Sequence, residues 1–211
     1  MERRELLKMI ALLTGGVVIG GEVFLTGCKT ASKTDAGFTA ANITLLDEVG
    51  ETIIPATATP GAKATQIGEF MKTIVTDCYT AKQQTAFTNG IASLEEACKK
   101  MNSKSFMDCT PQQRHDFLVS LEKESKDFNT KRDAEDKPKR EIHEQTNAKL
   151  AWKEQKEFEN TPSHYYTMMK QLTLWGYFSS KPGATQQLRH LPVPGKYDGA
   201  YPYKKGDKAF S

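Results

Sequence analysis

The sequence has few of the residues on which metal and catalytic sites depend. Its 211 residues include 4 Cys and 4 His, and none of them show the Cys-x-x-Cys, Cys-x-x-Cys-His or His-x-x-x-His spacing of zinc and haem sites. Glycine-rich nucleotide loops and the Gly-x-Ser-x-Gly nucleophile turn are missing as well. We therefore expect no metal ligand, no bound cofactor and no catalytic residue in this chain, although triads built from distant residues leave no such pattern.

The sequence also lacks an excess of one charge. Lys and Arg number 29 against 26 Asp and Glu, and the net charge of +3 is too small to hold nucleic acid electrostatically. The hydrophobic fraction of 38% becomes ordinary once the 15 Gly are added. This composition excludes a collagen, a polytopic membrane protein and a disulfide-dense mini-protein, and the length predicts one domain with a modest core.

The first 27 residues have the organisation of an export signal. An arginine pair opens the pattern, which consists of Arg3, Arg4, Leu6, Leu7 and Lys8. It resembles a twin-arginine signal peptide. Glycines and Glu22 make residues 9–25 less apolar than a membrane-spanning helix. The alternative is an uncleaved N-terminal anchor helix.

This segment ends in Leu25-Thr26-Gly27-Cys28, which resembles the lipobox of bacterial lipoproteins. The Cys28 thiol would carry a diacylglyceryl group, and each buried acyl CH2 contributes about 0.8 kcal/mol to membrane binding. We expect residues 1–27 to be removed, residues 28–37 to form a flexible tether, and the domain to lie on the periplasmic side of a bacterial membrane. Lys29 favours the outer membrane. The alternative is an ordinary signal peptide with Cys28 free.

Apolar residues recur at helical spacing beyond the tether and predict a single small all-α domain, residues 38–211. The expected helices cover residues 39–54, 67–79, 82–101, 111–121 and 162–176. Thr39 is a predicted N-cap, and Pro55 ends the first helix. Thr110-Pro111-Gln112-Gln113 is a strong helix start because Thr suits the N-cap, Pro the first turn and Gln the capping box.

Two segments of the domain lack the helical spacing of apolar residues. Sixteen of the 28 residues in 122–149 are charged, with alternating sign, and Pro138 is expected to break any helix there. We interpret this charged insert as a solvated helix pair or a mobile loop that interrupts the core; the alternative is a docking arm. Residues 177–211, rich in Gly, Pro, Tyr and Lys, predict an irregular tail.

Three cysteines remain in the expected mature domain besides Cys28. Cys98 ends one predicted helix and Cys109 directly precedes the Thr110 cap, so a disulfide could join them across the helix–loop–helix corner. Cys78–Cys98 is a competing pair. The alternative to any bridge is three buried thiols that act as small hydrophobic groups.

A series of short motifs follows in a fixed order along the chain. The motifs are residues 46–55, Gly61-Ala62, Gly68-Glu69-Phe70-Met71, Asp77-Cys78-Tyr79, Phe106, the Thr110 start, and residues 172–180 and 196–199. In this order they resemble the gluconate 2-dehydrogenase subunit 3 family. The resemblance implies a helical, non-catalytic small (gamma) subunit of a large FAD-containing dehydrogenase of the glucose–methanol–choline type. This chain would assist the folding and export of that sugar or polyol dehydrogenase and tether it to the membrane. FAD would lie in the partner, and electrons would leave through the partner or a cytochrome c subunit.

The aromatic C-terminal part is the expected partner-binding surface, because Trp and Tyr dominate interface hot spots. The candidate residues are Trp175, Tyr177, Phe178, Tyr197, Tyr201 and Tyr203. The alternative is that these rings pack on the chain's own helices. For the function as a whole, the alternative is an independent periplasmic lipoprotein that acts as a ligand-binding protein or a hydrolase.

Overall fold

Helices form nearly all the regular structure of this protein. The computed structural model describes residues 37–193, 195–196 and 198–210. Within these residues it contains helices and a single isolated β-bridge between Arg189 and Phe210, but no strand, which confirms the predicted all-α class. No helix in this part of the chain is both long enough and apolar enough to cross a membrane.

Several predicted features lie outside the described residues. They are the export-signal residues Arg3, Arg4, Leu6, Leu7 and Lys8, the lipidation candidate Cys28, and the aromatic candidate Tyr197.

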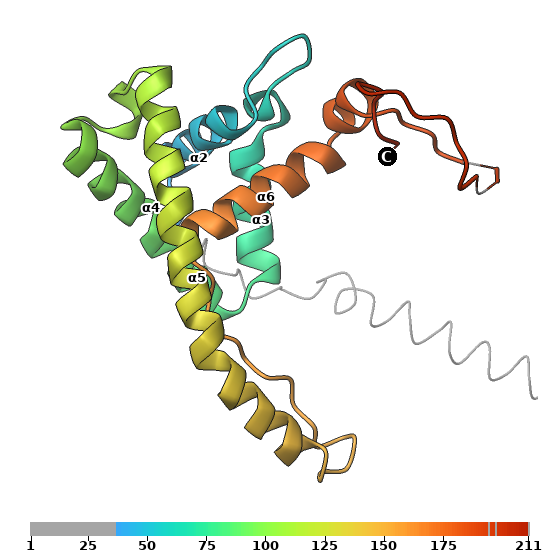
Figure 1. Cartoon of the computed structure of the whole chain (residues 1–211). Coiled ribbons are helices and arrows are strands. Elements are labelled where there is room, and N and C mark those ends of the chain that lie inside the picture. Colours follow the sequence, from blue (N-terminus) through green and yellow to red (C-terminus); the bar gives the residue numbers. More distant parts are fainter. Residues whose placement is uncertain (1–36, 194, 197, 211) are drawn as a thin grey trace, which may run out of the picture. The chain divides into compact units, whose positions relative to one another are not determined.

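The helices follow one another with short connections (Figure 1). The α-helices are α2 (Ala40–Ile53), α3 (Ile67–Cys78), α4 (Ala81–Asn102), α5 (Pro111–Asn147) and α6 (Tyr165–Ser179). Short turns of other helix types are η1 (Ala62–Thr65), η2 (Phe106–Asp108) and η3 (Gly183–Gln187). The first three α-helices match the predicted ranges to within one or two residues.

The core forms around α6, against which α2, α3, α4, α5 and η1 all pack. Its largest fully buried side chains include Tyr177, Phe87, Phe106, Phe117 and Met169. Met168 and Met169 are both buried, so the methionine pair of this helix fills space in the core.

Three helix starts are fixed by threonine caps. The Thr39 hydroxyl accepts a 3.2 Å hydrogen bond from the backbone N–H of Asn42, as predicted. Thr110 and Gln113 form the predicted reciprocal capping box, with bonds of 3.3 and 3.0 Å. Thr80 and Gln83 form a second box that was not predicted, although the same Thr-x-x-Gln spacing stands in the sequence.

The predicted break at Pro138 is wrong, because α5 runs through this residue without interruption. Proline removes one backbone hydrogen bond and costs about 3 kcal/mol in a helix interior. Contacts on both sides of Pro138 oppose this cost. Before it, the Asp136 carboxylate accepts bonds of 2.8 and 3.0 Å from the N–H and hydroxyl of Thr161; after it, Arg140 donates to Asn160 at 2.6 Å.

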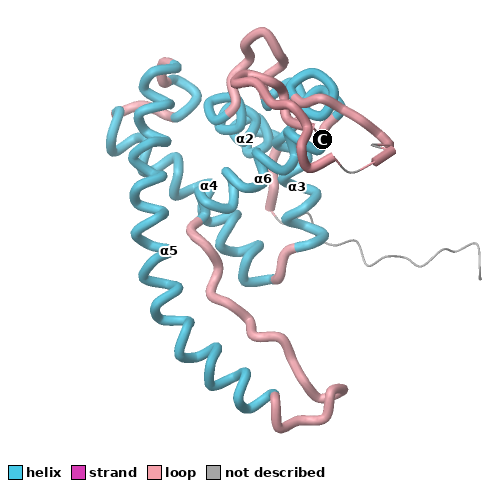
Figure 2. The backbone as a smooth tube through the Cα atoms, turned by 45° about the vertical axis from the view of Figure 1, so that its right-hand side comes forward, coloured by secondary structure: helices cyan, strands magenta, loops and turns pink. Residues whose placement is uncertain are grey.

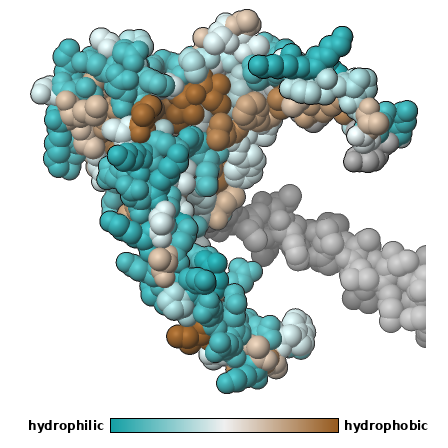
Figure 3. All heavy atoms as spheres, viewed as in Figure 1, coloured by the Kyte–Doolittle hydropathy of each residue, from teal (hydrophilic) through white to brown (hydrophobic). Residues whose placement is uncertain are grey.

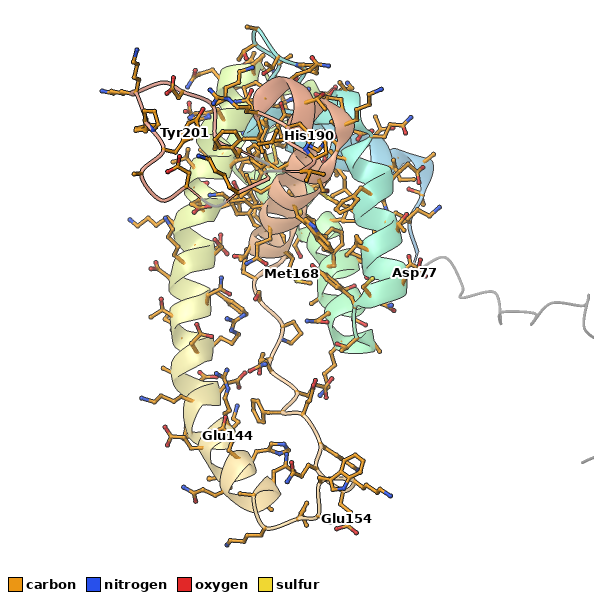
Figure 4. The ribbon with its side chains drawn as sticks, turned by 90° about the vertical axis from the view of Figure 1, so that its right-hand side faces the viewer. Asp77, Glu144, Glu154, Met168, His190 and Tyr201 are labelled. Carbon is orange, nitrogen blue, oxygen red and sulfur yellow. The ribbon has the colours of Figure 1, made fainter. Side chains whose placement is uncertain are left out.

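Most of the charged insert therefore lies in a two-sided arm, which we define as residues 126–163. The distal half of α5 forms one side, and an extended segment that returns along the helix forms the other (Figure 2). Figure 4 labels Glu144 and Glu154 near the turn between the two sides. Near this end, His143 and the backbone carbonyl of Lys156 are joined by a 2.8 Å bond. The insert is thus a single helix paired with a return segment, instead of a helix pair.

The irregular tail begins later than predicted. Helix α6 continues to Ser179, and η3 adds a short π-helical turn, so regular structure ends at Gln187. The side chain of Thr59 donates a 2.7 Å bond to that of Gln187, which ties η3 to the loop before η1.

Candidate functional site

Helix α6 carries apolar side chains on two faces, and only one of them is covered. The buried face contains Met169, Leu172 and Tyr177. On the other face Leu174, Trp175 and Phe178 are exposed, Trp175 to 55%. Their positions, with Leu174 and Phe178 four residues apart, put them on one side of a helix. Together with Phe70 of α3, we call these three residues the α6 face.

Close packing between α3 and α6 positions this face. A Cβ atom at Gly176 would lie 2.4 Å from Cδ1 of Ile67 and 2.5 Å from Cδ1 of Phe70, so only glycine lets α3 approach this closely. Phe70 consequently meets Trp175 edge to face, with ring centroids 5.4 Å apart at 87°. Figure 3 shows hydrophobic side chains gathered where α2 and α6 lie.

Tyr177 does not belong to this exposed surface, and its place among the candidates needs correction. Its side chain is 1% exposed, and its hydroxyl donates a 2.8 Å bond to the carbonyl oxygen of Pro60. Only its neighbour Phe178, whose ring stands edge to face at 5.2 Å, reaches the surface. Tyr177 therefore connects the core of α6 to the loop before η1.

The tail tyrosines form a separate group. The Tyr201 hydroxyl accepts a 2.9 Å bond from Arg189, and its ring packs edge to face on Phe210 at 5.3 Å. Arg189 also lies over the Phe210 ring, 4.8 Å from its centroid. Tyr203 is 74% exposed. Arg189, Tyr201 and Phe210 thus pack on one another, in a loop beyond α6 where Figure 4 labels Tyr201.

Sequence reasoning missed the exposed Leu174 and the half-buried Phe70 as members of the α6 face. The signal for Leu174 was present, because it lies one helical turn before Phe178. Phe70 could not have been assigned, because its contact with Trp175 depends on how α3 and α6 cross.

A half-buried ion-pair cluster holds the helices that surround α6. Glu48 of α2 accepts a 2.6 Å bond from Arg114 of α5 and is also paired with Lys63 of η1. Burial alone would raise the pKa of Glu48, but hydrogen bonds and attraction from Lys63 and Arg114 outweigh it and lower that pKa. Arg114 further donates to the carbonyl oxygens of Phe106 and Met107, at 3.0 and 2.7 Å. This cluster fixes α2, η1, η2 and α5 together.

A hollow of about 900 Å³ lies between α4, α5 and the segment that precedes α6. His164 lines it, and burial lowers the pKa of this histidine. Its Nδ1 accepts a 3.3 Å bond from the backbone N–H of Tyr166, and its Nε2 lies 3.9 Å from Glu124. Because Nδ1 caps the start of α6, His164 has a structural role here. No group of three or more potential metal ligands comes together among the described residues.

The cysteines of the corner lie side by side. The Sγ atoms of Cys98 and Cys109 are 3.6 Å apart, and both residues are buried as free thiols, whereas Cys78 is exposed. Burial raises the pKa of Cys98 to about 11.

Comparison with known proteins identifies the family to which this helical domain belongs. The searches of curated proteins and of solved structures each returned no match. The model of one family, gluconate 2-dehydrogenase subunit 3, matches residues 40–195, which run from the first residue of α2 into the tail. The matched range takes in every helix that packs on α6, the α6 face and the arm. On this evidence the chain belongs to the gluconate 2-dehydrogenase subunit 3 family.

Proposed function

We propose that this protein is an accessory, non-catalytic small subunit of a dehydrogenase complex, and that it binds a large FAD-containing subunit of the glucose–methanol–choline type. The α6 face, in a member of a family named for a dehydrogenase subunit, is the observation that carries this proposal. The partner would oxidise a sugar or polyol and hold the flavin. Electrons would leave through that partner or through a cytochrome c subunit.

The α6 face has the chemistry of an interface core. Exposed Trp175, Phe178 and Leu174 lie on one helix whose opposite side is anchored in the core, so their positions are fixed before any partner arrives. A preformed aromatic surface loses little side-chain entropy on binding. Central Trp residues with aliphatic and aromatic neighbours are the usual hot spots of protein interfaces. The tail loop with Tyr201 and Tyr203 would add contacts at the rim.

The proposal extends to export and anchoring, which rest on the sequence. The arginine pair Arg3 and Arg4 would direct a folded complex through twin-arginine export, and a partner that lacks its own signal would travel with this chain. Cys28 would then hold the complex on the periplasmic side of the membrane through its lipid. In this scheme one small subunit supplies the export signal, assists the partner's folding and provides the tether.

Co-purification tests the binding role. The full chain, tagged at its C-terminus, is isolated from membranes of cells that also express the flavoprotein encoded beside it. We expect a yellow complex with the absorbance of bound flavin. Trp175→Ala should weaken binding at least about 30-fold, the usual effect of losing a hot-spot side chain. Trp152→Ala is the matched control, because Trp152 is 77% exposed on the arm, outside the α6 face.

A colourless, partner-free protein would contradict the proposal and favour an independent lipoprotein. Equal binding by the Trp175→Ala and Trp152→Ala variants would remove the α6 face from the interface.

Export and anchoring need separate tests. Mass spectrometry of the mature N-terminus should find a lipid-modified Cys28, and an unmodified N-terminus at or near this residue would contradict the anchor. Changing both Arg3 and Arg4 to Lys should leave this chain and its flavoprotein together in the cytoplasm. Continued export of the double variant would contradict the twin-arginine route.

A further inference from the structure

The corner between α4 and α5 brings two cysteines into contact, one in α4 and one in the short connection before α5. Cys98 lies in the last turns of α4, and Cys109 directly precedes the Thr110 cap of α5. Their Sγ atoms are 3.6 Å apart. A covalent disulfide requires about 2.05 Å, so a small side-chain movement would bring the two sulfur atoms to bonding distance.

The surroundings hold this corner in place. Ser103, at the end of α4, adopts a left-handed backbone conformation with φ of 56°, which turns the chain toward η2. Arg114 then binds the carbonyl oxygens of Phe106 and Met107. Phe106 itself is fully buried and packs against Phe117 of α5, with ring centroids 6.1 Å apart. The approach of the two cysteines is therefore built into the fold on both sides.

We propose that Cys98 and Cys109 form an intramolecular disulfide that closes the α4–α5 corner, and that Cys78 stays free. This modification site is independent of any partner, and therefore of the function proposed above. Cys78 is exposed at the end of α3, whereas Cys98 already has Cys109 as its buried neighbour.

The bond forms by exchange with the disulfide of an oxidant, either a protein thiol–disulfide oxidoreductase or oxidised glutathione. The Cys109 thiol loses its proton, and its thiolate attacks one oxidant sulfur and displaces the other as a thiolate. The Cys98 thiolate then attacks the Cys109 sulfur of this mixed disulfide and releases the second oxidant sulfur. The two protons from the protein thiols end on the two oxidant sulfurs, so the protein dithiol is oxidised and the oxidant disulfide is reduced.

Burial determines when this exchange can occur. Thiolates are the attacking species, and burial raises the pKa of Cys98 to about 11, so little Cys98 thiolate exists at neutral pH in the closed corner. Exchange therefore proceeds while the chain folds or while the corner is open. Once formed, the bond is protected from reductants by the same burial.

Peptide mapping tests the pairing directly. The full chain is unfolded, refolded in a buffer of reduced and oxidised glutathione, alkylated in denaturant and digested with trypsin. Cleavage after Lys or Arg places Cys28, Cys78, Cys98 and Cys109 in four different peptides. We expect residues 83–99 linked to residues 105–114, with a mass two hydrogen atoms below the sum of the separate peptides. Cys78 should be alkylated.

Stability gives a second readout. In the chain-entropy model, a crosslink that closes a loop of this size lowers the unfolding equilibrium constant by roughly a hundredfold. Oxidation should produce this change in the unmodified chain and in Cys78→Ser, but not in Cys109→Ser. Full alkylation of both Cys98 and Cys109 after refolding would overturn the proposal, and so would a link between Cys78 and Cys98.

Discussion

The Tyr177 hydroxyl donates a 2.8 Å hydrogen bond to the carbonyl oxygen of Pro60, a residue 117 positions earlier in the chain. This bond joins the C-terminal part of α6 to the loop between α2 and η1. The Glu51 carboxylate joins the two ends of the same loop. It accepts bonds from the backbone N–H groups of Ala56, where the loop begins, and of Lys63 in η1, at 2.8 and 2.9 Å. A loop rich in small residues is thereby fixed against the helix that carries the exposed apolar face.

Tyr177→Phe should lower the free energy of unfolding by about 1 kcal/mol, because it removes one intramolecular hydrogen bond and leaves the packed ring in place. Urea unfolding monitored by circular dichroism measures the change. Tyr203→Phe is the matched control and should change stability by less than about 0.5 kcal/mol, since Tyr203 is 74% exposed. Equal losses in the two variants would contradict the role of the Pro60 bond.

Gly176→Ala should destabilise the domain by about 1–3 kcal/mol, the usual cost of overpacking a core. The added methyl group would lie 2.4 Å from Ile67 and 2.5 Å from Phe70, and this clash outweighs the better helix propensity of alanine. Gln171→Ala, at an exposed position of the same helix, is the control. A gain in stability for Gly176→Ala would show that α3 can move away from α6 at little cost.

The arm should loosen in acid because of Asp136. The backbone N–H of Thr161 donates to this carboxylate and lowers its pKa, and Lys139 and the Thr161 hydroxyl lower it further. A carboxyl whose pKa is lower in the folded state stabilises that state fully above its unfolded pKa of about 3.9. The contribution is lost as the pH falls from there through the folded pKa.

The amide signal of Thr161 in an NMR pH titration reports this change. We expect it to shift in the acid range in the unmodified chain, and Asp136→Asn should abolish the acid-dependent part. Asp127→Asn, a substitution at an exposed position of the same helix, is the control and should keep it. An unchanged titration in Asp136→Asn would assign the shift to another group.

Deleting residues 191–211 should weaken co-purification with the flavoprotein while the helical domain stays folded. The deletion removes Tyr201, Tyr203 and Phe210, whereas the bond between Thr59 and Gln187 remains and all buried core residues precede residue 191. Thermal unfolding should therefore be unchanged. Intact binding together with intact folding would show that the tail plays no part in the interface.

Local signals carried most of what could be predicted about the fold. Thr39 and Thr110 cap their helices as expected, because a capping hydrogen bond spans only three residues. The predicted helix break at Pro138 was wrong because the prediction considered only the proline itself. The tertiary contacts of its neighbours, above all the bonds between Asp136 and Thr161, which lie 25 residues apart, could not be read from the local sequence. Helix α5 continues through Pro138 because residues far away in the sequence, Thr161 and Asn160, bind it on both sides of the proline.

The α6 face was predicted only in part, because the exposure of its residues also depends on tertiary packing. Periodicity identified α6 as an apolar helix but could not tell which of its two apolar faces meets the core, because both have helical spacing. Trp175 and Phe178 proved exposed, and their neighbour Tyr177 proved buried. The approach of Cys98 and Cys109, by contrast, had a local signal in the short chain between them, although the sequence left Cys78–Cys98 as a competing pair.

The length of the arm can change without disturbing the core. Each of its sides is held mainly by the other, through pairs such as Arg140 with Asn160 and His143 with Lys156, and the buried apolar residues of α5 all precede it. Matched shortening or lengthening of both sides at the far end of the arm, beyond the contacts of Asn129 with Thr167 and of Glu159 with Lys82, would leave the helices around α6 untouched. Related chains are therefore free to differ in length here, and the arm is the natural place to insert a reporter domain.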